Sequence, residues 1–197
     1  MNKHAVIIRF WHNDYDIFKW RLAYFQSMVL PRLQNQTVQD FDICLLSDPV
    51  WHDRLRGFDP RIRPFSMKTG KYDYKKQGNF KLEDTYGLDH YAIQTRIDSD
   101  DLVSPYFIEA VRTAHKKTPY ITFQPELFIL DELKIRKMKY QYRTDKPSAF
   151  LSVMNYGGVI YDRVFLRFND KPCTLIPEGY CWVSIHNYHS GKTNRDI

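Results

Sequence analysis

The sequence predicts an α/β fold with a mostly parallel central sheet, and three stretches support this prediction. Residues 4–10 (HAVIIRF) and 42–47 (DICLLS) are near-continuous apolar runs, typical of strands that are covered on both faces of a parallel sheet. A helical pattern separates the two runs, as a right-handed βαβ crossover requires. Residues 91–97 (YAIQTRI) predict a further strand, and residues 106–115 predict the helix that follows it.

The composition fits one folded domain. The chain has 197 residues, of which 43% are hydrophobic, and its 10 Pro and 8 Gly are too few for a disordered chain. We therefore expect a single domain over residues 1–197, either complete or one module of a longer protein. The formal charge of +6 suits partners that carry phosphate, such as nucleotides and nucleic acids, or an anionic membrane surface.

The cysteines and the apolar runs indicate in which cellular compartment the protein works. Cys44, Cys173 and Cys181 show no metal-ligand spacing, which favours reduced, buried thiols over a disulfide framework. The N-terminus lacks the apolar run of a signal peptide, and no apolar stretch reaches 18 residues, so we expect no membrane span. These features predict a cytoplasmic protein.

In the first half of the chain, helical spacing follows the first strand. The pattern predicts that Asp14 or Asp16 caps this helix and that Pro31 kinks or ends it; its apolar positions are Ile17, Trp20, Tyr24, Phe25, Met28 and Val29. Residues 61–65 predict a short strand, and residues 82–91 look helical. The basic, aromatic run 68–81 is either a solvated loop or a loop that contacts phosphates or an acceptor.

The second half of the chain predicts several short strands. Residues 120–123 (YITF) form one of them, and residues 127–133 and 135–142 look like a hairpin or strand pair. Further short apolar runs cover residues 150–154, 174–177 and 180–185.

Three carboxylates lie at the end of the middle strand. Asp98, Asp100 and Asp101 fall within four positions, with only Ser99 among them, and Ser104 and Pro105 then predict the cap and first turn of a helix. Open α/β sheets bind ligands at the carboxyl ends of their strands. Acids this close repel one another unless a hard cation or a set of donors holds them.

Three interpretations of this cluster compete. It could be a solvated acidic turn that caps the next helix. A calcium loop of the EF-hand type needs an oxygen ligand at its fifth position and glycine at its sixth, where this chain has Leu102 and Val103. We favour the third interpretation, an Asp-x-Asp metal site for a nucleotide diphosphate, because a strand precedes the cluster and a helix follows it.

These residues resemble a known family. RIDSDD at 96–101, followed by a helix that starts with proline, is similar to the Asp-x-Asp segment of GT-A glycosyltransferases. The rhamnosyltransferase family is the closer likeness, because the chain also has Arg9-Phe10, LPRLQNQT at 30–37, and Trp182 followed by His186. The resemblance therefore extends over most of the chain.

The resemblance implies a GT-A fold, a Rossmann-like α/β/α sandwich that binds a nucleotide-sugar donor, UDP- or GDP-linked, with Mn²⁺ or Mg²⁺. It also implies transfer of a sugar, such as rhamnose, to a hydroxyl of a glycan acceptor. The metal site would use Asp98, Asp100 and Asp101, with Asp100 as the direct ligand and Asp98 near the ribose. A late histidine, His186 or His189, would complete it.

The rest of the site is less defined. We expect Arg9, His12 and Asp48 to line the base and ribose pocket together with Arg96 and Asp98, although structural ion pairing of Arg9, His12 and Asp48 is an open alternative. The chain lacks the late Glu-Asp pair that would supply the base of an inverting enzyme. The base candidates are Asp131, Glu126, Glu178 and Asp162, so the stereochemical outcome stays open.

Two other functions were weighed against this one. A basic nucleic-acid-binding module without catalysis would explain the charge and the aromatic residues of 61–81. The acidic cluster opposes it by repelling phosphate. A phosphatase of the haloacid-dehalogenase type needs its acids after the first strand, with Thr or Val where Leu102 stands, so it is disfavoured.

Overall fold

The computed structural model describes residues 3–10 and 15–66 in the first half of the chain, and 87–88, 90–124, 126–131, 134–138, 150–154, 174–177 and 179–185 in the second. Its helical segments are α1 (Tyr15–Tyr24), η1 (Phe25–Val29), α2 (Leu30–Gln34), η2 (Pro49–Trp51), α3 (His52–Arg56) and α4 (Phe107–His115). Its strands are β1 (His4–Arg9), β2 (Asp42–Ser47), β3 (Ile62–Ser66), β4 (Ile93–Asp98), β5 (Leu102–Val103), β6 (Tyr120–Phe123), β7 (Glu126–Asp131), β8 (Lys134–Met138), β9 (Leu151–Met154), β10 (Thr174–Ile176) and β11 (Cys181–Ile185).

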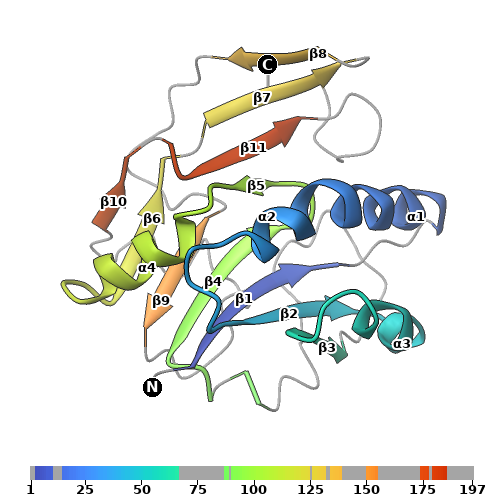
Figure 1. Cartoon of the computed structure of the whole chain (residues 1–197), viewed down its shortest axis with the longest axis horizontal. Helices are drawn as coiled ribbons and strands as arrows, with labels where there is room; N and C mark the ends of the chain where they lie inside the picture. Colours follow the sequence, from blue (N-terminus) through green and yellow to red (C-terminus); the bar gives the residue numbers. More distant parts are fainter. Residues whose placement is uncertain are drawn as a thin grey trace, which may run out of the picture.

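The central sheet has seven strands in the order β10-β6-β9-β4-β1-β2-β3 (Figure 1). Strand β1 pairs in parallel with both β2 and β4, and β2 with β3, while β9 runs antiparallel to β4 and β6. The mostly parallel α/β sheet predicted from the sequence is confirmed. The chain leaves β1 toward β2 on one side and returns with β4 on the other, so the order reverses between β1 and β4. Such a reversal is where open α/β sheets form a ligand crevice.

The sheet separates two apolar clusters because successive side chains of a strand point to opposite faces. From β1, Val6 and Ile8 join the larger cluster, to which α1, α2, α3 and α4 contribute Phe18, Leu33, Leu55, Phe107 and Val111. Ala5 and Ile7 join a smaller cluster on the other face, with Leu46 and Val153. Helices α1, α2 and α4 lie in front of the sheet in Figure 1, on the face of the larger cluster.

The helical run continues past Pro31, so of the two outcomes predicted for this residue, a kink or an end, the end does not occur. Helix α1 runs into the π-helical segment η1, and α2 follows with Pro31 in its first turn. Proline lacks an N–H and is tolerated where that N–H has no intrahelical partner. The wider turn of η1 precedes Pro31, and α2 ends only at Gln34, where Asn35 N–H donates to the carbonyl of Pro31 over 3.0 Å.

A second, smaller sheet has the order β5-β11-β7-β8, and it lies above the central sheet in Figure 1. Its β7–β8 hairpin confirms the strand pair expected after residue 126. Strand β5 was not predicted: it follows the acidic cluster and pairs antiparallel with β11 through Val103 and Cys181. The prediction that Ser104 and Pro105 start the next helix is wrong, because the Ser104 hydroxyl makes no hydrogen bond to a described residue, Tyr106 is the N-cap and α4 begins at Phe107.

The helix expected over residues 82–91 does not reach its predicted end. The described residues Gly87, Leu88 and His90 form turns, and Gly87 has φ of +110°. That left-handed conformation breaks a right-handed helix, and glycine adopts it without a Cβ clash. Tyr91 N–H then closes a turn onto the Leu88 carbonyl over 3.2 Å.

The described thiols agree with a reduced, buried state. Cys44 and Cys181 are buried and form no disulfide. Burial raises the pKa of Cys44 to about 12, so its reactive thiolate form is suppressed. Cys173 lies outside the described residues. In the part of the chain that the structure describes, no helix is long and apolar enough to cross a membrane.

A buried polar chain crosses the sheet from β1 to α4. His4 Nε2 contacts Thr95 Oγ1 over 2.8 Å, Thr95 Oγ1 contacts Ser152 Oγ over 2.7 Å, and Ser152 Oγ contacts His115 Nε2 over 2.8 Å. His115 Nδ1 lies 2.9 Å from the Thr118 carbonyl, which can only accept, so Nδ1 carries the hydrogen and Nε2 accepts from Ser152. The chain then runs in one direction, from His4 Nε2–H to the Thr118 carbonyl, with both imidazoles neutral.

Candidate functional site

Three predicted site residues lie at the ends of neighbouring parallel strands. Arg9 ends β1 and is in register with Asp98, which ends β4. Asp48 directly follows β2, on the other side of β1. The structure therefore brings Arg9, Asp48 and Asp98 to one edge of the sheet, at the point where the strand order reverses. This is the edge at which open α/β folds bind nucleotides.

The acidic cluster forms a tight, mostly buried turn. Asp101 N–H donates to the Asp98 carbonyl over 3.2 Å, and Asp100 and Asp101 are only 3% and 0% exposed. Arg21 on α1 reaches the turn, where its Nη1 donates to Ser99 Oγ over 3.3 Å. Burial of this degree excludes the simplest interpretation, a fully solvated acidic turn.

Asp98 is held by an arginine on its own strand. Arg96 Nη2 lies 3.1 Å from Asp98 Oδ1, and residues two apart on a strand share one face. The Arg96 side chain is 9% exposed and that of Asp98 is 20% exposed. These two predicted nucleotide-binding residues thus pair with each other, and Asp98 keeps contact with solvent at the sheet edge.

Asp48 also has a structural task. Its Oδ1 accepts the Val50 N–H over 3.0 Å and so caps η2. A carboxylate has two oxygens with several acceptor positions, so this bond leaves capacity for a ligand hydroxyl.

The chemistry of the acidic turn fits a hard divalent cation. Asp100 Oδ2 is buried, and no described residue gives it a hydrogen bond. A buried carboxylate oxygen without a donor is costly, and cation coordination by oxygen relieves that cost. Within the described residues, however, no three His, Cys, Asp or Glu side chains group as a metal site. A cation at Asp100 therefore needs ligands from a bound diphosphate or from other parts of the chain.

Several predicted residues lie outside the described residues. These are His12, Asp162, Glu178 and the two histidines that the resemblance assigns to the metal, His186 and His189. Glu126 and Asp131 are the first and last residues of β7, in the second sheet. Glu126 is in register with Trp182, and Asp131 with Lys134.

The sequence analysis missed two polar side chains that hold the acidic turn, Arg21 and Gln36. Arg21 falls three residues after Phe18 and four before Phe25, so it interrupts the apolar stripe of the first helix. Gln36 falls three residues after the buried Leu33 and is itself 4% exposed. For Arg21, the available signal was a polar residue at an apolar position of the helical repeat. Gln36 lies two residues past the end of α2, in the LPRLQNQT segment.

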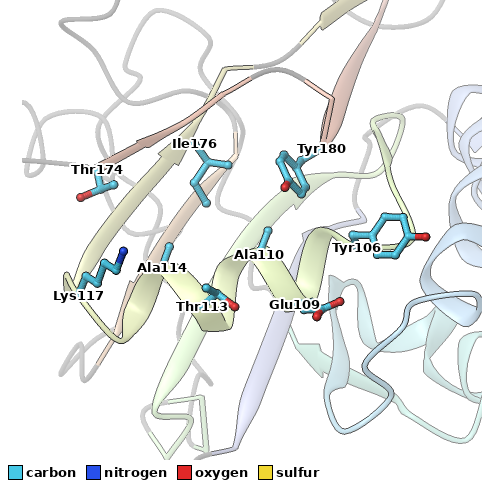
Figure 2. Close-up of a pocket in the computed structure, with 9 residues that line it drawn as sticks. All are labelled: Tyr106, Glu109, Ala110, Thr113, Ala114, Lys117, Thr174, Ile176 and Tyr180. Carbon is cyan, nitrogen blue, oxygen red and sulfur yellow. The ribbon is translucent and has the colours of Figure 1, made fainter.

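A groove of about 550 Å³ lies along α4 (Figure 2). Ala110 and Ala114 face Ile176 across it, with Tyr180 near one end and Lys117 near the other. No acidic-turn residue lines the groove, and Lys117 is the one cation among its described lining residues. A mostly apolar groove with a single cation does not suit a diphosphate.

The sequence of this chain matches a known family over residues 9–126, which is more than half of its length. The family is described as "putative rhamnosyl transferase". The chain belongs to this family. The matched region of this family member starts at Arg9 and contains the acidic turn, Arg21 and Gln36. No curated protein matches the sequence.

Solved structures share the fold of this rhamnosyl transferase family member. The S. aureus TarS 1–349 complex with UDP-GlcNAc matches with a TM-score of 0.59 and 10% identity over 97% of this chain and 61% of that one. The TarS 1–349 complex with UDP matches at 0.56 and 10% identity, over 94% and 61% of the two chains. This chain thus spans about three fifths of TarS 1–349. The likeness confirms the predicted GT-A type α/β fold.

Proposed function

We propose that this glycosyltransferase is metal-dependent and moves a sugar from a nucleotide-diphosphate donor to a hydroxyl of a glycan acceptor. The proposed donor carries UDP or GDP, and the proposed sugar is rhamnose, after the family description. One observation carries the proposal: a buried acidic turn stands where the strand order reverses, and Asp100 Oδ2 has no described donor. The structural relatives in complex with UDP and UDP-GlcNAc support this class of donor.

Each strand end has a task in this proposal. Asp98 and Asp48, on either side of Arg9, present carboxylate oxygens that can accept hydrogen bonds from ribose hydroxyls. Arg9 supplies a cation at the end of β1, where it favours the charge of a diphosphate. Asp100 is the proposed ligand of Mn²⁺ or Mg²⁺, and Asp101 supports it from the buried side of the turn. When bound, such a cation stabilises the negative charge of the departing diphosphate.

The base that would take the acceptor proton is proposed among the carboxylates of the second half of the chain. Glu126 and Asp131 lie on β7, whose parallel neighbour β11 joins the second sheet to β5 directly after the acidic turn. This connection supports a base from β7. The other candidates, Asp162 and Glu178, are outside the described residues.

Nucleotide binding tests the metal requirement. We expect UDP or GDP to bind with Mn²⁺ or Mg²⁺ present, and to bind at least tenfold more weakly in EDTA, because the acids otherwise repel the diphosphate. Isothermal titration calorimetry with and without metal measures both affinities. Equal heats in the two conditions would reject a metal-dependent site.

The alternative function is a basic nucleic-acid-binding module, and a salt titration separates it from the enzyme. Oligonucleotide binding that survives at physiological salt and falls steeply with added salt would favour the alternative. We expect no such binding, because the acidic turn occupies the crevice at which phosphates would dock. Hydrolysis of a panel of nucleotide-sugars with Mn²⁺ then identifies the donor.

A further inference from the structure

We propose that Gln36 is a positioning residue, whose buried amide fixes the acidic turn in the geometry that binds the donor. The inference rests on the proposed function, because the turn matters for activity only if it binds metal and diphosphate. Gln36 itself touches none of the carboxylates. It acts through the segment that joins the acidic turn to α4.

The contacts of Gln36 use nearly all of its hydrogen-bonding capacity. Nε2 donates to the Arg32 carbonyl over 2.9 Å and to the Ser104 carbonyl over 2.6 Å. Oε1 accepts the Ile108 N–H over 3.0 Å. A primary amide offers two donors and one acceptor oxygen at this reach. Leucine would supply none of these, an ionised glutamate only the acceptor, and asparagine is one methylene too short.

The two long-range contacts bracket the start of α4. The first N–H groups of a helix have no partner within the helix, and the N-cap residue Tyr106 gives no side-chain cap. Gln36 caps α4 from a distance through Ile108, and the same amide holds the Ser104 carbonyl. Ser104 follows Asp101 by three residues. Gln36, two residues past the end of α2, therefore fixes the backbone just after the acidic turn.

Other residues of α1 and of the segment after α2 also contact the acidic turn and the start of α4. Arg21 on α1 binds Ser99 inside the turn. Thr37 N–H donates to the Pro105 carbonyl over 2.8 Å, and Thr37 Oγ1 donates to Glu109 Oε2 over 3.0 Å. The Thr37 backbone contact does not depend on the Gln36 side chain. Removing the amide of Gln36 should therefore leave α4 packed against the core but let its first turn shift relative to the acidic turn.

Apolar packing and the hydrogen bonds of Gln36 contribute differently to the segment between the acidic turn and α4. The packing stabilises the fold, whereas the hydrogen bonds fix where the segment lies. Leu102, Val103, Phe107 and Ile108 are buried, so apolar packing already holds the segment against the core. Packing of that kind tolerates small shifts along the segment. A displacement of about 1 Å at a reacting site can cost about a hundredfold in rate. We thus expect the amide to affect turnover more than folding.

The test compares Gln36→Leu with Gln34→Leu, the same change two residues earlier. Gln34 is exposed and its Nε2 donates to Asp59 Oδ2 over 3.2 Å, away from the acidic turn. We expect Gln36→Leu to lower kcat/KM for donor hydrolysis at least tenfold and to speed hydrogen exchange at the amides of residues 101–108. Gln34→Leu should stay within twofold in kcat/KM and leave that exchange unchanged.

Gln36→Glu serves as the second variant if Gln36→Leu folds poorly. The carboxyl keeps the acceptor for Ile108 N–H and regains one donor when protonated, so its deficit relative to the natural protein should shrink as the pH falls. Equal losses in Gln36→Leu and Gln34→Leu would overturn the inference, as would a lower melting temperature with kcat/KM unchanged.

Hydrogen exchange also separates this inference from the proposed function. If the natural protein binds no nucleoside diphosphate with either metal, the proposed function fails, and no role in catalysis remains for Gln36. The inference then fails as well, but faster exchange at residues 101–108 in Gln36→Leu would show that the hydrogen bonds of Gln36 hold this segment. If nucleotide binds and exchange is unchanged in Gln36→Leu, the inference alone is overturned.

Discussion

Asp100→Asn is expected to lower donor hydrolysis at least about a hundredfold while the protein stays folded. Asparagine has nearly the same shape but no charge, so its amide oxygen is a much weaker ligand of Mn²⁺ than a carboxylate. Stability without metal should be unchanged or higher, because the buried Asp100 Oδ2 has no described donor and gains nothing from its charge. Thermal unfolding with and without Mn²⁺ and UDP, together with a hydrolysis assay, measures both effects.

Asp53→Asn provides the control for the same chemical change. The Asp53 side chain is 98% exposed and, among the described residues, pairs with Arg56 on the surface of α3, a contact worth at most about 1 kcal/mol. Neither activity nor the metal-induced gain in melting temperature should change in this variant. An Asp100→Asn protein that is fully active, or that unfolds without added metal, would make the acidic turn a structural feature.

Mild acid is expected to destabilise the fold strongly through His4. Burial, with smaller contributions from Arg112 and His115, lowers the pKa of His4 from 6.5 to about 3. The unfolded chain therefore binds a proton between pH 6.5 and pH 3 that the folded chain refuses. Stability from this residue is complete above pH 6.5 and is lost as the pH falls to 3, by on the order of 5 kcal/mol. Burial also lowers the pKa of His115, which adds in the same direction.

The pH dependence of the unfolding free energy tests this expectation. In His4→Gln, an amide nitrogen can still donate to Thr95, but the titrating group is gone, so the slope between pH 6.5 and pH 4 should flatten. His90 is exposed, and His90→Gln should keep the slope of the natural protein. If the slopes of both variants equal that of the natural protein, acid sensitivity comes from groups other than His4.

The strands were the most predictable part of the fold. Residues 42–47 were predicted with the bounds of β2, and residues 4–10 with those of β1 to within one residue. Both strands are covered on two faces, so each is a nearly uninterrupted apolar run. A short run of this kind is typical of a strand in a parallel sheet. The start of α4 was predicted less well, because a partner remote in sequence contributes to it: the Gln36 side chain, rather than that of Ser104, accepts an N–H of its first turn.

The candidate site was predictable in part. Parallel strands end at a common edge, so the acids after β4 could be placed beside Arg9 and Asp48 from the sequence pattern alone. The ion pair between Arg96 and Asp98 and the cap that Asp48 gives to η2 were not predicted, because both depend on the side-chain geometry at the strand ends. The supporting side chains Arg21 and Gln36 were not identified, because a sequence shows that a polar residue interrupts an apolar stripe but not what it meets.

The sequence by itself determined the α/β class, the parallel strands and the carboxylates at the end of β4, since hydrophobic period and local charge are properties of neighbouring residues. Only the tertiary structure decided that the strand order reverses between β1 and β4, that β5 pairs with β11, and that Gln36 caps a helix 72 residues away. These features depend on which distant segments meet. That choice is made by the packing of the whole core, where each buried polar group must find a partner wherever the fold provides one.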